Sequence, residues 1–235
     1  MLSGLAYLEM RVRDPSACRA FYGGAMGLEE VGPGSPAATT SVVAYRVGPS
    51  LLGLQGNPDA TTGVSRSGEQ LDWADVPGSV NHLAFYVDST EQAYAILKGK
   101  AEPLTLTSGP RDMPLGHTYL QRSLLDYADP SGFVVQIAEV VEPRSDMQAR
   151  RKEKHALAHE AGVSGLMLGF DHLSIYTRDL GPAREFYGGK LGLSGYGDRS
   201  VNGTKQSVFV VGMTDLEMNE SELYVSSSVS EGFPK

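Results

Sequence analysis

The sequence lacks the features that mark secreted, membrane-spanning and nucleic-acid-binding proteins. Cys18 is the only cysteine among 235 residues, so no disulfide can form within the chain and nothing calls for an oxidising compartment. No apolar run approaches the ~18 residues of a membrane span, and stretch 1–13 reads as a strand instead of a signal peptide. The net charge of −8 argues against nucleic acid and anionic membranes as partners. We therefore expect a soluble, cytoplasmic protein.

A repeat organises what the sequence does contain. Segment 7–28, YLEMRVRDPSACRAFYGGAMGL, aligns without a gap with segment 172–193, HLSIYTRDLGPAREFYGGKLGL. The pieces VGPSLLG at 47–53 and VGMTDLE at 211–217 correspond in the same order, after a one-residue deletion. A fainter copy opens at His82 with HLAFYVD and continues with helical spacing. The chain is therefore predicted to contain three copies of one module.

Each copy predicts a strand, a helix and three further strands. Asp14 and Asp179 stand where they can cap the helix, and Gly27 and Gly192 follow it as stop signals. The later strands are expected at 28–33, 40–47 and 50–56, at 102–107, 117–127 and 132–141, and at 193–199, 206–212 and 214–226. A βαβββ unit has one apolar sheet face that must be covered by another unit. The expected fold class is α+β, with the repeated modules forming curved mixed sheets around a cavity.

The repeat also predicts a division into domains. We expect a first domain over 1–142, built from modules 1–60 and 78–142, then a polar helical linker over 143–166. Residues 167–235 would form the third module, as half of a second domain. Because three is an odd number, one module needs a partner from another chain or from sequence absent here. A homodimer is the expected solution.

The module openings at 80–89 and 172–193, with the closing DPSGFVVQ at 129–136, resemble the vicinal oxygen chelate superfamily. That superfamily includes glyoxalase I, extradiol dioxygenases and bleomycin-binding resistance proteins. The resemblance implies a divalent metal at the mouth of paired sheets, with one ligand from the first strand and one from the last strand of each module. Those places hold Tyr7 and Gly53 in the first copy, His82 and Gln136 in the second, and His172 and Glu217 in the third.

The candidate metal ligands are therefore His82, Gln136, His172 and Glu217. Imidazole and carboxylate groups suit Fe, Zn, Ni, Co or Mn, and Glu217 is also the candidate catalytic base. The four residues form one set if copies two and three share a cavity. Two histidines and two glutamates would meet if copy three pairs with itself across a two-fold axis. Pairing of copies one and two would leave a poor metal site or none.

Two functions follow from the resemblance. The first is a metal-dependent enzyme that chelates a small oxygenated molecule, as a lyase or isomerase of the glyoxalase kind or as a ring-cleaving dioxygenase. Tyr7, His117 and Tyr119 are its candidate substrate contacts, although His117 can equally make a turn hydrogen bond. The alternative is a metal-free protein that binds a small hydrophobic molecule, as resistance proteins do. The residues at the ligand places that favour this alternative are Tyr7, Gly53 and Gln136.

Overall fold

The computed structural model describes residues 4–31, 42–56, 80–100, 104–113, 122–140, 145–163, 165–201 and 203–220. Copy one consists of β1 (Tyr7–Val12), α1 (Pro15–Arg19), η1 (Ala20–Ala25), β2 (Glu29–Glu30), β3 (Val42–Val47) and β4 (Ser50–Gly56). Copy two consists of β5 (Val80–Tyr86), α2 (Thr90–Lys98), β6 (Thr105–Met113), β7 (Arg122–Ala128) and β8 (Val134–Val140), and α3 (Ser145–Glu160) follows it. Copy three consists of β9 (Gly169–Thr177), α4 (Leu180–Ala183), η3 (Arg184–Lys190), β10 (Gly195–Val201), β11 (Thr204–Val211) and β12 (Thr214–Glu220). The βαβββ order expected from the repeat is present in all three copies.

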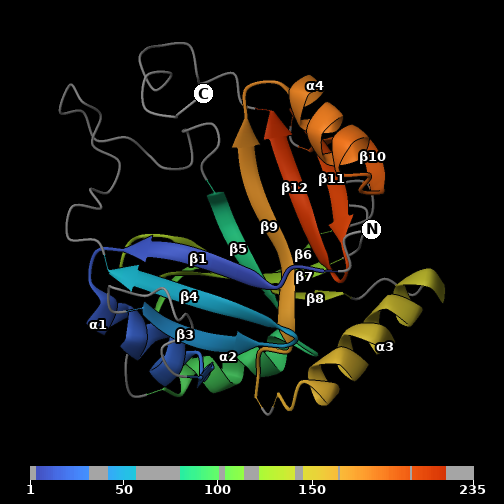
Figure 1. Ribbon diagram of the computed structural model, residues 1–235. Coiled ribbons are helices and arrows are strands. Elements are labelled where there is room, and N and C mark those ends of the chain that lie inside the picture. Colours follow the sequence, from blue (N-terminus) through green and yellow to red (C-terminus); the bar gives the residue numbers. More distant parts are fainter. Residues whose placement is uncertain are drawn as a thin grey trace, which may run out of the picture.

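The strands form two mixed sheets, which confirms the expected fold class. The smaller sheet has the order β1-β4-β3-β2 and belongs to copy one. The larger has the order β10-β11-β12-β9-β5-β8-β7-β6, so copies two and three share it. Its two halves meet through their first strands, β5 and β9, which run antiparallel with Leu83 opposite Leu173. In Figure 1 the smaller sheet lies across the lower part of β9, and α3 lies beside the same end of that strand. The predicted division into domains stays a prediction.

The two equivalent helices of copies one and three begin and widen in the same way. The side chain of Asp14 accepts hydrogen bonds from the Ser16 and Ala17 amides at 2.9 and 3.0 Å, and Asp179 accepts one from Gly181 at 2.7 Å. The second half of each helix, at 20–25 and 184–190, is π-helical. Periodicity did not predict this widening, because the FYGG segments keep an apolar pattern that also fits an ordinary helix.

One core joins the two sheets. Buried side chains from α1, η1 and β4 of copy one contact those of β5, β7, β8 and β9, and Phe85 stacks on Phe170 with 5.7 Å between ring centroids. The Tyr22 hydroxyl donates a buried hydrogen bond of 3.0 Å to Asp129, which links copy one to copy two. A second cluster lies under α4 and contains Phe209 and Met218. Within the described part of the chain, no helix is both long and apolar enough to cross a membrane.

Candidate metal centre

The meeting of β5 with β9 brings the predicted ligands of copies two and three to one face of the large sheet. Ser174 of β9 pairs with His82 on one side and with Glu217 of β12 on the other. His172 lies two residues before Ser174, so its side chain projects from the same face. His82 and His172 hold the same position in their modules, so the pairing of the first strands brings them together. Glu217 joins them because β12 lies next to β9.

The donor atoms of His82, His172 and Glu217 lie close enough together to hold one ion. The two Nε2 atoms are 2.7 Å apart, and His172 Nε2 lies 3.9 Å from Glu217 Oε2. All three donor atoms lie within 4.8 Å of one another, and no other such group of three occurs among the described residues. Two imidazole nitrogens bound at ~2.1 Å to one ion are separated by roughly 3.0–3.4 Å. The residues therefore fit a metal after shifts of up to about 1 Å between their donor atoms.

A buried carboxylate fixes the orientation of His172. Asp171 Oδ2 lies 2.8 Å from His172 Nδ1, and both side chains are buried. An ionised carboxylate only accepts hydrogen bonds. The Nδ1 atom of His172 therefore carries the hydrogen, and the Nε2 lone pair points toward His82 and Glu217. The second oxygen of Asp171 pairs with Lys154 of α3 at 2.7 Å. A carboxylate behind the ligand nitrogen is the common arrangement for metal-binding histidines.

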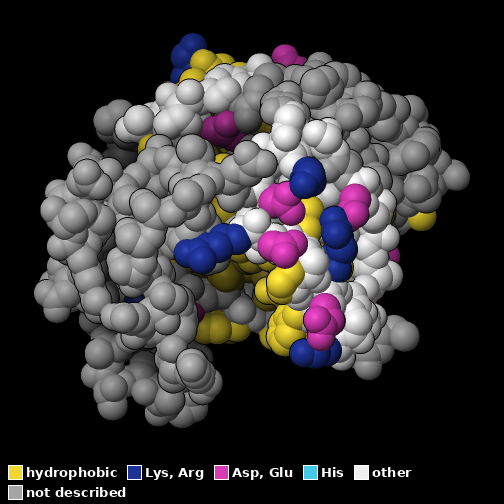
Figure 2. Space-filling view, turned by 90° about the horizontal axis from the view of Figure 1, so that it is seen from above, with side chains coloured by type: hydrophobic (Ala, Val, Ile, Leu, Met, Phe, Trp, Pro, Cys, Tyr) yellow, Lys and Arg dark blue, Asp and Glu magenta, His cyan; other side chains and the backbone are white. Residues whose placement is uncertain are grey.

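Glu217 lies in a buried polar network on the same face. Gln206 Nε2 lies 3.4 Å from Glu217 Oε2 and donates to Asn219 Oδ1 at 2.7 Å. Asn219 Nδ2 in turn donates to Ser174 Oγ at 2.8 Å. Figure 2 shows acidic and basic side chains interspersed on the described part of the face seen from above. His172 and Glu217 are themselves buried, at 2% and 6% exposed, and the neighbours of Glu217 restrict its movement.

The amide of Gln136 on β8 is hydrogen-bonded to the neighbouring strand on the other side from the two histidines. It is buried, and its Nε2 donates to Asp126 Oδ1 of β7 at 2.9 Å. Since β7 lies on the far side of β8 from β5, this hydrogen bond holds the amide away from His82. The ligand role of Gln136 stays a prediction.

In copy one, Tyr7 and Gly53 occupy the space of a ligand pair. A Cβ added at Gly53 would lie 2.6 Å from Tyr7 Cζ, so the ring lies where a last-strand side chain would be. The Tyr7 hydroxyl donates to Glu9 at 3.0 Å. Partial burial, and then the hydrogen bond and the charge of Glu9, raise the pKa of Tyr7. Tyr7 belongs to the smaller sheet, and His117 and Tyr119 lie outside the described residues. The substrate roles of all three stay predictions.

Sequence reasoning missed several neighbours of the cluster. Asp171 directly precedes His172, and Asn219 lies two residues after Glu217, so strand alternation could have placed Asn219 on the same face. Gln206 belongs to β11, and Asp126, the partner of Gln136, belongs to β7; sequence patterns do not determine the register of either strand. Nothing in the polar pattern of α3 marks Lys154 as buried.

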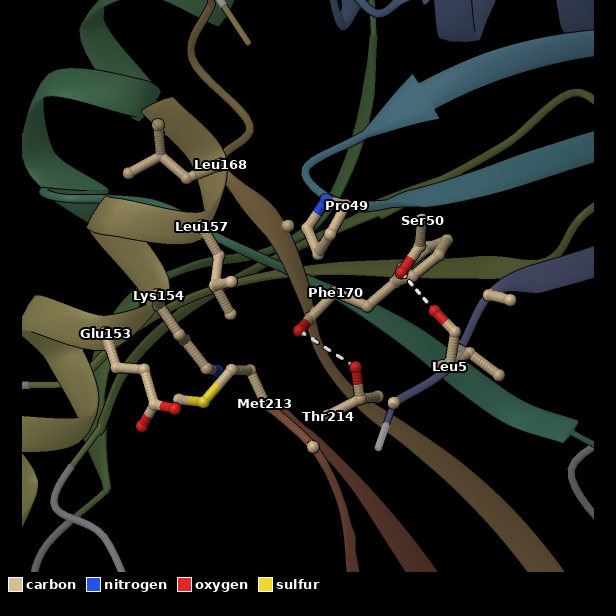
Figure 3. A pocket seen from close by; sticks show the side chains of 14 residues that line it. Leu5, Pro49, Ser50, Glu153, Lys154, Leu157, Leu168, Phe170, Met213 and Thr214 are labelled. Carbon is tan, nitrogen blue, oxygen red and sulfur yellow. Dashed lines mark hydrogen bonds between the residues drawn. The ribbon is translucent and has the colours of Figure 1, made fainter. Parts of the chain in front are cut away.

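A cavity of about 450 Å³ lies between the first copy and α3. It is bounded by residues 4–6, the β3–β4 turn, α3, the start of β9 and the β11–β12 turn. Figure 3 shows Glu153 and Lys154 extending from α3 toward Met213 of that turn. Apolar side chains form much of the cavity wall. Lys154 also lines the cavity, and its ion pair with Asp171 connects the cavity to the metal centre.

The chain was compared with known proteins. Residues 4–137 match the profile of the Glyoxalase/Bleomycin resistance protein/Dioxygenase superfamily, and no curated protein matches. A candidate dioxygenase from Bacillus subtilis gives a TM-score of 0.59 at 14% identity, over 93% of this chain and 64% of its own. Glyoxalase I from Zea mays gives 0.60 at 14% identity, over 94% of this chain and 68% of its own. At this identity the two structures show a shared fold, and the chain spans about two-thirds of each. The chain belongs to the Glyoxalase/Bleomycin resistance protein/Dioxygenase superfamily.

Proposed function

We propose that the chain carries a divalent-metal centre of the ring-cleaving dioxygenase type, held by His82, His172 and Glu217. The convergence of these three donors within 4.8 Å supports the proposal. Two histidines and one carboxylate with open positions form the donor set of non-haem Fe(II) oxygenases. A bound ion would hold two adjacent oxygens of a substrate and stabilise the charge that develops on them.

The charges around the centre support one class of substrate. Two neutral imidazoles and one carboxylate leave a divalent ion with a net charge of about +1. The neighbouring Asp171 and Lys154 charges cancel each other. The centre therefore favours an anion with two adjacent oxygens, such as a singly ionised ortho-diol. The hydrogen-bond network of Gln206 and Asn219 would help to hold Glu217 in place as a ligand.

A glyoxalase-type lyase or isomerase is the runner-up. It would require Gln136 to turn from Asp126 toward the ion as a fourth ligand, and Glu217 to act as the base. The hydrogen bond between Gln136 and Asp126 favours the three-donor set. The partly apolar cavity of about 450 Å³ supports the other alternative, a metal-free binding protein.

Metal analysis and turnover test the proposal together. The chain is loaded without oxygen with Fe(II), Mn, Zn, Ni or Co, and bound metal is measured after desalting. We expect one ion per chain, and oxygen uptake with ortho-diols when Fe(II) or Mn is bound. His172→Ala and Glu217→Ala should lose the ion, whereas His159→Ala on the exposed face of α3 should retain it.

Two results would contradict the dioxygenase proposal. Turnover of α-hydroxy carbonyl compounds without oxygen uptake would favour the glyoxalase-type reaction. The metal-free protein would be favoured if the wild-type chain retains no ion. In that case wild type and His172→Ala should bind a small apolar molecule with the same affinity.

A homodimer is also proposed. Among the described strands, β1 pairs with β4 alone, whereas its counterparts β5 and β9 each pair with a last strand and with each other. The first strand of a second copy could pair with β1 in the way that β9 pairs with β5. A monomeric mass by light scattering at micromolar concentration would refute the dimer.

A further inference from the structure

Among the described side chains of α3, the helix between copies two and three, Lys154 is a charged group that lies in the interior. Lys154 of α3 is 5% exposed, although its neighbours Lys152, Glu153 and Ala156 are exposed. Lysine is almost never buried unless it is paired. Its Nζ lies 2.7 Å from Asp171 and 4.8 Å from the centre of the Tyr86 ring.

Asp171 connects this lysine to the centre. Its side chain is fully buried, with one oxygen on Lys154 and the other on His172 Nδ1 at 2.8 Å. The opposite nitrogen of the same ring, Nε2, lies 2.7 Å from His82. A continuous chain of contacts therefore runs from α3, through Asp171 and across the imidazole, to the place proposed for the ion.

We propose that Lys154 and Asp171 are positioning residues that fix the Nδ1–H tautomer and the ring orientation of His172. The inference rests on the proposed metal centre, and it assigns a role to a helix that the sequence presents only as a linker. Asp171 selects the hydrogen on Nδ1, so that Nε2 carries no hydrogen and directs its lone pair toward His82 and the place proposed for the ion. Lys154 holds the second oxygen of Asp171 and balances its charge.

The competing explanation is an ion pair that only stabilises the interior. Replacing a buried pair by apolar side chains of similar size is often neutral for stability, so stability alone does not separate the two. The tautomer of His172 does separate them. A pair that acted only on stability would leave both the tautomer of His172 and the affinity for Zn²⁺ unchanged in a variant that folds.

The test uses the double variant Lys154→Met, Asp171→Leu in the full chain. Lys205→Met, Glu220→Gln is the matched control, because it removes an ion pair of the same 2.7 Å length in which the lysine is exposed. Long-range ¹H–¹⁵N NMR of metal-free protein labelled at histidine reports the tautomer. Titration with Zn²⁺ then reports affinity by competition with a chromogenic chelator.

We expect wild type and control to show the Nδ1–H form of His172, and the test variant to show a mixture or the Nε2–H form. Affinity for Zn²⁺ should fall 10- to 100-fold in the test variant, the usual effect of losing such a partner, and should not change in the control. Lys154→Arg should retain both the tautomer and the affinity. If the double variant fails to fold, Lys154→Met, Asp171→Asn keeps the shape of the site, and the amide should still allow both tautomers.

The outcomes separate the two proposals. A folded test variant with the wild-type tautomer overturns the positioning role, whatever its affinity. A changed tautomer with unchanged affinity for Zn²⁺ overturns the role of the pair toward the metal. If the wild type binds no Zn²⁺ but the tautomer still changes, the positioning of His172 stands and the proposed metal function fails.

Discussion

Replacing Gln136 by glutamate would place two carboxylates at hydrogen-bond distance inside the large sheet. Gln136 and Asp126 are 5% and 8% exposed, and Gln136 Nε2 lies 2.9 Å from Asp126 Oδ1. Two unit charges at that separation repel by about 6 kcal/mol with an effective dielectric constant of 20. Protonating a glutamate of ordinary pKa at pH 7 costs only about 4 kcal/mol, so the folded variant should take up one proton. The cost of protonation, about 4 kcal/mol, is therefore the expected loss in the free energy of unfolding at pH 7.

The loss should depend on pH with a defined sign. The pKa of the new carboxyl is raised in the folded state, so below pH 7 the folded variant binds a proton that the unfolded chain releases. The loss should therefore shrink by about 1.4 kcal/mol for each pH unit of acidification, to about 2 kcal/mol near pH 5.5. Urea unfolding of wild type and variant at both pH values measures it. Gln136→Met is the control, and it should lose about 1–3 kcal/mol at both pH values because Asp126 loses the hydrogen bond from Gln136.

The same variant decides whether position 136 reaches the ion. If it does, the new carboxylate becomes a fourth ligand, and a saturating divalent metal should restore most of the lost stability. If the metal stabilises wild type but restores nothing in the variant, Gln136 is not a ligand. A loss below about 1 kcal/mol that is the same at both pH values would refute the like-charge argument itself.

Three further predictions concern the scaffold. Gly53→Ala should lower the free energy of unfolding in urea by about 1–3 kcal/mol, because the new methyl group displaces the Tyr7 ring; equal losses with and without Tyr7→Ala would contradict this. Burial raises the pKa of Cys18 to about 11, so a thiol reagent at pH 8 should label native protein far more slowly than unfolded protein, and rapid native labelling would disprove it. Phe85→Ala should cost about 3–5 kcal/mol by thermal unfolding, since the ring is fully buried against Phe170; a loss under 1 kcal/mol would mean that the core refills.

Local features of the fold could be predicted because they depend on neighbouring residues. Asp14 and Asp179 cap their helices as expected, and strand 50–56 was placed with its observed bounds. The β6 strand was less well placed: it runs from 105 to 113 instead of 102 to 107. Its register shifts against β7 around Ser108, and alternation carries no signal for such irregularity.

The candidate site was predictable only as a set of alternatives. The equal register of His82 and His172 in their modules placed them near each other if first strands meet, but the sequence allowed three pairings. The choice depends on contacts across β5 and β9, such as that between Leu83 and Leu173, which are 90 residues apart. The partners of the ligands were harder still. Lys154 reaches Asp171 only because α3 lies beside the start of β9, and local pattern does not encode that placement.

The Tyr7–Gly53 pair prevents copy one from gaining a ligand pair through a single substitution. A glutamate at position 53 would meet the Tyr7 ring, since even a methyl group there lies 2.6 Å from Tyr7 Cζ. A histidine at position 7 would still lack its carboxylate partner across the strands. Neither single substitution builds half of a metal site. Each change alone would therefore confer no benefit. The two positions are therefore epistatic: a ligand pair in copy one requires both changes together, whereas loop and surface positions can change one at a time.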